Sequence, residues 1–194
     1  MIDYIKGTIC DLSPTCVTLE VYSIGYLVNI SLTTYSALEN RQEAKLFISE
    51  VIREDSHQLF GFMTKQEREM FLLLISVSGV GANTARMMLS SLSVEELAAA
   101  VTSENVIALK GVKGIGLKTA QRIIVDLRGK TAHLSGNSDN KLFGEHNQNK
   151  QEALSALVML GFSQQQSLKV LDKIFFDNSS TSIELAIKTA LKML

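Results

Sequence analysis

The stretch Val77-Ser78-Gly79-Val80-Gly81 recurs farther along the chain as Val112-Lys113-Gly114-Ile115-Gly116, and the match continues with Thr84-Ala85 on Thr119-Ala120. Two glycines that flank an apolar residue permit a tight turn while the central side chain anchors that turn in a core. In both copies a segment with helical periodicity follows the second glycine. The repeat therefore predicts two helical hairpins with glycine turns.

The start of the helix after each turn is a candidate anion site, because its first N–H groups lack intrahelical partners and its dipole is positive there. Such a site binds a phosphate without reading a base, so recognition depends on salt and not on sequence. The candidate phosphate-binding residues of the two copies are Gly79, Val80, Gly81, Asn83, Gly114, Ile115, Gly116, Lys118, Thr119 and Arg122. The alternative is that both turns only connect helices.

The charge distribution supports an anionic partner for the central region. The 194-residue chain has a net charge of −1, but residues 1–62 hold four basic and eight acidic side chains, and residues 63–133 hold nine and six. Residues 134–194 hold six of each. The basic surplus is concentrated between residues 105 and 130, where a phosphate backbone would find it.

The two turns differ in the charge around them. Lys113, Lys118 and Arg122 accompany the second turn. The side chains that accompany the first turn are Ser78, Asn83 and Arg86. We therefore expect the second hairpin to bind phosphate more strongly than the first.

The region before the hairpins has strand periodicity. Alternating or Val-, Ile-, Thr- and aromatic-rich segments occupy residues 2–12, 16–22, 26–32, 44–52 and 58–62. A short helix is expected at residues 34–39, before the fourth strand. Five strands of this length predict a Greek-key barrel of the OB type over residues 1–62.

The rest of the chain has helical periodicity. Capping boxes at Thr64-x-x-Glu67 and Ser93-x-x-Glu96 mark two helix starts. The expected helices of an all-α domain at residues 63–133 are 65–76, 82–91, 94–101, 104–110 and 117–128. A polar segment, 134–149, predicts a flexible linker, and helices at 151–160, 164–175 and 183–193 predict a three-helix module over 150–194. The fold class is thus multi-domain α+β.

Several functional classes lack their signatures. The chain has no Gly-x-x-x-x-Gly-Lys-Ser/Thr sequence for nucleotide binding. Its three histidines are scattered, and Cys10 and Cys16 have no partners at metal-ligand spacing, so we expect no cofactor and no metal. No apolar run is long enough for a membrane span and the start is unlike a signal peptide, so we expect a cytoplasmic protein without membrane contact.

The duplicated turns resemble the helix-hairpin-helix motif, and the order of domains resembles the RuvA family of Holliday-junction-binding proteins. The most specific fragments are Arg53-Glu54-Asp55 and Gly114-Ile115-Gly116-Leu117-Lys118-Thr119-Ala120, and the resemblance covers essentially the whole chain. It implies a non-catalytic homotetramer that holds a four-way junction open and planar, as one tetramer or two. It also implies a RuvB motor hexamer, which supplies ATP-driven branch migration, and the RuvC resolvase as partners. The chain departs from the family at Asn83, where a lysine is common.

The same resemblance implies two further sites. Glu54 and Asp55 match the family's acidic pin, whose carboxylates repel phosphates at the crossover and so exclude the wrong geometry. The terminal module resembles a ubiquitin-associated-type bundle, which implies RuvB contacts at Leu157, Leu160 and Phe162. The alternative is that these apolar residues form the core of the small bundle.

Two other functions are weighed against junction binding. Some base-excision glycosylases carry a Gly-x-Gly-x-Lys-Thr-Ala hairpin whose lysine attacks the sugar, and Lys118 has that position, but the next acidic residues are only Asp126 and Asp139. A single-strand binder would need basic and stacking aromatic residues on the barrel. The barrel is acidic instead, and we expect most of its aromatics to be buried, namely Tyr4, Tyr22, Tyr26, Phe47, Phe60 and Phe62.

Overall fold

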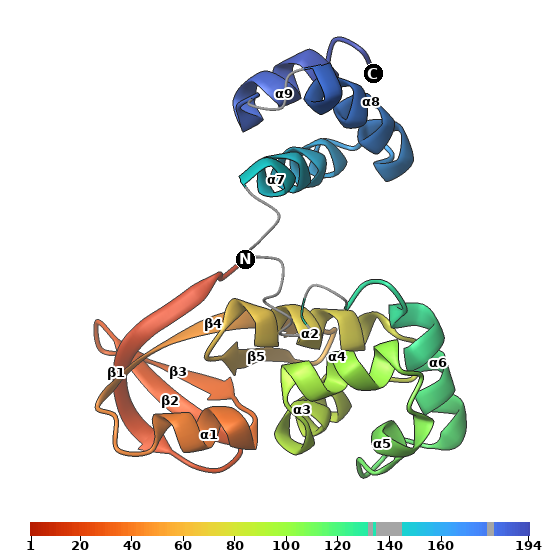
Figure 1. Ribbon diagram of the computed structural model, residues 1–194. Coiled ribbons are helices and arrows are strands. Elements are labelled where there is room, and N and C mark those ends of the chain that lie inside the picture. Colours follow the sequence, from red (N-terminus) through yellow and green to blue (C-terminus); the bar gives the residue numbers. More distant parts are fainter. Residues whose placement is uncertain (132–133, 135–144, 178–180) are drawn as a thin grey trace. The chain divides into compact units, whose positions relative to one another are not determined.

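A computed structural model describes residues 1–131, 134, 145–177 and 181–194 (Figure 1). The chain forms two compact units, Met1–Gly136 and Asn137–Leu194. Most of the predicted linker, residues 135–144, lies outside the described residues.

The first half of the first unit is a closed five-stranded barrel. Its strands are β1 (Tyr4–Leu12), β2 (Cys16–Val21), β3 (Ile24–Asn29), β4 (Glu43–Ile52) and β5 (His57–Phe62). The strand order is β1-β2-β3-β5-β4, in which only the β3–β5 pair is parallel. Helix α1 (Leu32–Leu38) connects β3 to β4, so the expected barrel and its short helix are confirmed.

The expectation about the barrel aromatics is only partly right. Phe60 and Phe62 are buried, but the side chain of Tyr4 is half exposed and Tyr22 is 97% exposed. Tyr22 lies at the tip of the β2–β3 hairpin, where it and Ser23 both have positive φ, so no neighbouring strand covers it. Tyr4 faces solvent under the ammonium group of Lys45, which lies 4.0 Å from the ring centroid.

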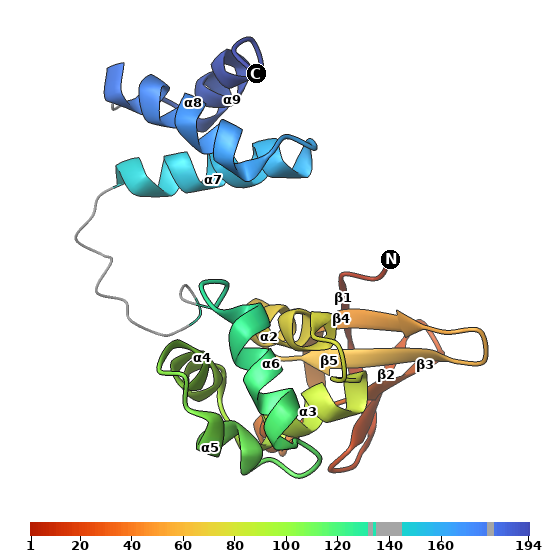
Figure 2. The same ribbon diagram turned by 90° about the vertical axis from the view of Figure 1, so that its right-hand side faces the viewer.

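The second half of the first unit is helical. It consists of α2 (Lys65–Ser76), α3 (Ala82–Ser91), α4 (Val94–Thr102), α5 (Val106–Lys110) and α6 (Leu117–Leu127) (Figure 2). Both predicted capping boxes are formed, because the hydroxyls of Thr64 and Ser93 accept from the N–H groups of Glu67 and Glu96, whose carboxylates accept in return. Strong capping explains why these helices start where the sequence places them.

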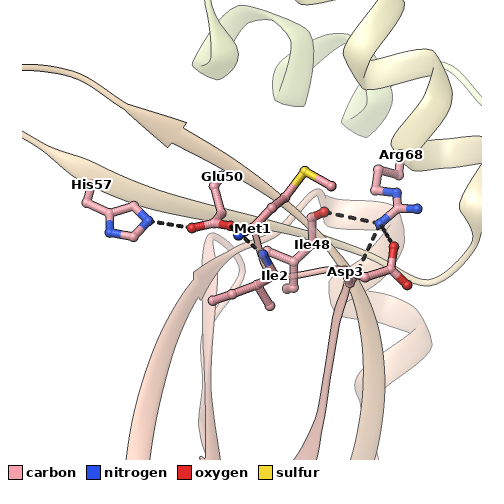
Figure 3. A network of polar contacts seen from close by, with 7 residues as sticks. All are labelled: Met1, Ile2, Asp3, Ile48, Glu50, His57 and Arg68. Atoms are coloured by element: carbon pink, nitrogen blue, oxygen red, sulfur yellow. Dashed lines mark hydrogen bonds and ion pairs between the residues drawn. The ribbon is translucent and has the colours of Figure 1, made fainter. Parts of the chain in front are cut away.

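The last strand of the barrel contributes to the hydrophobic core of the helices, while the rest of the barrel interior forms a core of its own. Phe60 and Phe62 of β5 pack against Phe71 of α2, with ring centroids 5.1 and 4.9 Å apart. At the edge of this contact, Arg68 of α2 pairs with the Asp3 carboxylate at 2.6 Å and donates to the Asp3 carbonyl at 2.8 Å (Figure 3). This packing fixes the orientation of the helical region on the barrel.

The second unit is a three-helix bundle of α7 (Glu145–Met159), α8 (Gln164–Asp177) and α9 (Ile183–Ala190). Its core contains Ala153, Leu157, Leu171, Ile174, Ala186 and Ala190. Helix α7 begins at Glu145, inside the segment predicted as linker. The sequence did not predict this start because the first turns are polar and show no apolar period. Among the described residues, no helix is both long and apolar enough to cross a bilayer.

Candidate nucleic-acid interface

The two glycine turns have nearly identical backbones. Gly79 and Gly114 have φ values of +94° and +92°, a conformation that favours glycine. The N–H of Val80 donates to Val77 at 3.0 Å, and the N–H of Ile115 donates to Val112 at 3.1 Å. We call α2, the first turn and α3 the first hairpin, and α5, the second turn and α6 the second hairpin.

The central residue of each turn anchors it in the core, as predicted. Val80 and Ile115 are each only 5% exposed and belong to the core that the helices form with the end of β5. Val77 and Val112, at the starts of the turns, are buried in the same cluster. The glycines between these anchors are left at the surface.

The helix starts after the turns are open. The N-cap residues Gly81 and Gly116 make no side-chain capping hydrogen bond, whereas Thr64 and Ser93 cap α2 and α4. A Cβ added at Gly79, Gly81 or Gly116 would meet no atom within 4 Å. The first N–H groups of α3 and α6 are thus available to an anion that approaches closely.

Both hairpins contribute to one surface depression, which we call the hairpin hollow. It is lined by Ser78, Gly79, Lys118, Thr119, Gln121 and Arg122. The guanidinium of Arg122 reaches across it and donates to the carbonyl of Ser78 at 3.4 Å. Residues far apart in the sequence therefore meet at a single basic concavity.

The structure places the predicted phosphate-binding side chains at the surface. Asn83, Lys118 and Arg122 are exposed, and Thr119 is half-buried beside them. Arg86 is different, because it points to the barrel and donates to the carbonyl of Thr15 at 2.8 Å. The sequence places Arg86 near the first turn, and the folded barrel reveals its hydrogen-bond acceptor.

The acidic residues Glu54 and Asp55 lie exposed in the loop between β4 and β5. The loop is closed by a hydrogen bond from the N–H of Arg53 to the carbonyl of Ser56 at 2.8 Å. Below the loop, the Glu50 carboxylate contacts the His57 ring at 3.0 Å (Figure 3). The pKa of Glu50 is lowered, mainly by a hydrogen bond from the Ile2 N–H and to a smaller extent by the one from His57.

Comparison with known proteins accounts for all three parts of the chain. Residues 1–61 match the model of the RuvA N-terminal domain, 71–130 match the SAM-like helix-hairpin-helix tandem, and 148–194 match the RuvA C-terminal domain. The chain belongs to the RuvA family. Relatives named Holliday junction branch migration complex subunit RuvA are 53% identical in Azobacteroides pseudotrichonymphae, 50% in Bacteroides fragilis and 49% in Porphyromonas gingivalis. Each alignment covers the whole of both chains.

In this RuvA-family chain, the terminal module does not present all three predicted contact residues. Leu157 is completely buried in the module core, so its expected role in partner binding is replaced by a structural one. Phe162 is half-buried and packs against the same core. Leu160 is 60% exposed, because the helix ends just before it and Gly161 turns the chain with φ +98°.

The family's helical region offers little support for catalysis by Lys118. The hairpin hollow contains no carboxylate among its lining residues. Within the described part of the chain, no three His, Cys, Asp or Glu side chains are grouped to hold a metal ion.

Proposed function

We propose that this protein is the junction-binding subunit of a branch migration complex, which holds four-way DNA open and planar through sequence-independent contacts. The observation that carries the proposal is the pair of matched glycine turns, together with the basic hollow that the first turn and α6 line. The name shared by the full-length relatives supports a Holliday junction as the target.

Backbone amides and nearby cations supply the DNA contacts in this proposal. The N–H groups at the starts of α3 and α6 bind phosphate oxygens, and the turn glycines allow the duplex backbone to approach. The residues proposed to bind phosphate are Gly79, Val80, Gly81, Asn83, Gly114, Ile115, Gly116, Lys118, Thr119 and Arg122. None of them reads a base edge.

The acidic loop supplies selectivity by repulsion. Glu54 and Asp55 are exposed at the end of the β4–β5 hairpin, and neither forms an ion pair with another described residue. Carboxylates held near a strand crossover oppose the approach of phosphates, so a collapsed junction is disfavoured relative to an open one.

Assembly and partners complete the proposal. Residues 1–62 carry the acidic loop, 63–133 bind DNA, and 150–194 dock a RuvB motor hexamer, with 134–149 connecting them. Leu160 and Phe162 are the proposed docking residues of the module. The subunit acts as a homotetramer, singly or in pairs, in the cytoplasm with the cell's DNA. ATP hydrolysis belongs to RuvB, and RuvC is a further partner on the same junction.

Competition binding tests the proposal. The full chain is titrated with a labelled four-way junction in the presence of unlabelled junction, linear duplex or single strand, and the particle mass is measured with and without junction. We expect junction to compete best and the mass to equal four or eight subunits on the DNA. Equal competition by all three DNAs would overturn the proposal.

The same titration and one further assay distinguish the two other functions from junction binding. A single-strand binder would be displaced best by the single strand. A lyase would form a covalent adduct with abasic-site DNA under borohydride, and Lys118→Ala would abolish that adduct.

A further inference from the structure

Arg86 occupies a special place in the duplicated hairpins. When Gly81 is aligned with Gly116, Arg86 of α3 corresponds to Gln121 of α6. Gln121 lines the hairpin hollow, whereas Arg86 is half-buried against the barrel. Equivalent positions in the two hairpins therefore face different neighbours.

The contacts of Arg86 join the first hairpin to the barrel. Its Nη1 donates to the carbonyl of Thr15, between β1 and β2, at 2.8 Å, and to the Asn29 side-chain oxygen, at the end of β3, at 3.5 Å. The Asn29 amide in turn donates to the Leu59 carbonyl of β5 at 3.1 Å. Strand β5 follows directly on the acidic loop. A short polar path thus runs from α3 to the strand that leaves this loop.

A second set of hydrogen bonds strengthens the same attachment. The N–H of Leu32 donates to the Ser90 hydroxyl at 3.0 Å, and that hydroxyl donates to the Arg86 carbonyl at 2.8 Å. The Thr33 hydroxyl also donates to the Leu89 carbonyl at 3.0 Å. Figure 1 shows the result, with α3 lying beside α1. In contrast, Arg122 of the second hairpin contacts the first hairpin at the hollow, through its hydrogen bond to the Ser78 carbonyl.

We infer that Arg86 is a positioning residue, which fixes the first hairpin relative to the acidic loop and thereby sets the preference for four-way over linear DNA. This inference rests on the proposed function. A linear duplex needs only a hairpin surface, but a junction arm must meet the hairpins while its crossover meets the loop. A fixed angle between α3 and the barrel serves the second requirement alone.

The inference predicts a specific pattern of losses. Arg86→Met keeps an unbranched, largely aliphatic side chain but removes the donors to Thr15 and Asn29. Losing a hydrogen bond that involves a charged group changes an equilibrium constant by about tenfold. We therefore expect the preference for junction over duplex to fall about tenfold. Duplex affinity and the dependence of binding on salt should not change, since no phosphate contact is lost. Arg86→Lys, which keeps a donor and the charge, should restore part of the preference.

The experiment measures junction and duplex dissociation constants over a range of salt for the wild type, Arg86→Met, Arg86→Lys and the control Arg41→Met, which changes an exposed arginine between α1 and β4 in the same way. The melting temperature of each variant is recorded alongside. Arg41→Met should keep the wild-type preference for junction over duplex. If Arg86→Met does not fold, the comparison rests on Arg86→Lys, whose preference should be lower than that of the wild type by a fewfold.

Each other outcome overturns the inference. A shallower salt slope for Arg86→Met, with weaker duplex binding, would make Arg86 a direct phosphate contact. If Arg86→Met has a lower melting temperature and an unchanged preference, Arg86 is only structural. If Arg86→Lys is as unstable as Arg86→Met but keeps the full wild-type preference, the same conclusion follows. A wild type that shows no preference for junctions overturns the proposed function itself, which distinguishes that failure from the failure of the Arg86 inference.

Discussion

The first and second hairpins share a backbone but differ in what their side chains contact. Their turn glycines have φ values of +94° and +92°, and their central residues are equally buried. Around the second turn, Lys113, Lys118 and Arg122 are exposed, whereas the first hairpin commits Arg86 to the barrel. Duplicated geometry therefore does not mean duplicated chemistry.

This difference suggests a division of labour within one interface. In the proposed interface, the second hairpin would supply most of the charge that meets phosphate, and the first hairpin would supply a fixed direction relative to the barrel. Arg122 joins the two, because it belongs to α6 and donates to the carbonyl of Ser78 in the first turn.

The largest expected effect concerns the shared turn geometry. Gly79→Ala and Gly114→Ala should each destabilise the protein by roughly 1–2 kcal/mol, because both positions need a positive φ. Each should also weaken junction binding by about tenfold or more, since a shifted turn misdirects N–H groups that hold a charged phosphate. Denaturant unfolding and junction titration measure the two effects.

Gly161→Ala provides the matched control. Gly161 also has a positive φ, +98°, but lies in the other compact unit. It should lose stability without losing junction affinity. If either turn variant loses stability while its junction affinity stays at the wild-type value, that turn does not contact DNA and the hairpins are not equivalent in backbone binding.

The sequence allowed accurate prediction wherever local chemistry determines the structure. The capping box at Thr64 and the glycine turns place α2 and α3 at their observed residues. Helix α7 begins earlier than predicted, at Glu145, because a polar first turn carries no apolar period. Local patterns are thus reliable where a helix has both a cap and a buried face.

The rest depends on tertiary contacts that no local pattern contains. The direction of Arg86 is determined by the Thr15 carbonyl, which is distant in sequence. In the terminal module, Leu157 and Leu160 look alike in the sequence, yet Leu157 is buried and Leu160 is exposed, because the helix ends at Met159, between them. The exposure of Tyr22 likewise follows from its place at a hairpin tip.

The second prediction asks whether the two hairpins alone determine selectivity. Changing Glu54 to Gln and Asp55 to Asn removes two negative charges from the acidic loop without touching either hairpin. Junction affinity should stay the same or rise, while the preference for junction over duplex falls severalfold, because repulsion of phosphates is lost. Parallel titrations with junction and duplex check this. A simple loss of affinity for both DNAs would refute repulsion.

The third prediction concerns a substitution that makes the charge of the first hairpin more like that of the second. Asn83 is exposed near the start of α3, so Asn83→Lys adds a cation beside the first turn. One added phosphate contact should steepen the log-log salt slope by about 0.9 and tighten binding a fewfold at low salt. Asn83→Gln is the neutral control. An unchanged slope for the lysine variant would mean that the first turn does not face a phosphate.

The smallest expected effect concerns the barrel that holds the first hairpin. Hydrogen bonds from the Ile2 N–H and His57 lower the pKa of Glu50, so they stabilise the fold above the pKa of the unfolded chain, about 4.3. That stabilisation is lost as the pH falls through the lower, folded pKa. Glu50→Gln should therefore lose less stability than the wild type between about pH 5 and pH 3. Identical losses in urea unfolding across this range would contradict the assignment.

The inequality of the hairpins is tested most directly by the salt dependence of junction binding. The slope is compared for the wild type, for Lys118→Ala with Arg122→Ala, and for Ser78→Ala with Asn83→Ala. Each lost phosphate contact by a cation removes about 0.9 from the log-log slope. We predict a slope shallower by up to about 1.8 for the second-hairpin pair and an unchanged slope for the first-hairpin pair. Equal slopes in all three proteins would contradict the account.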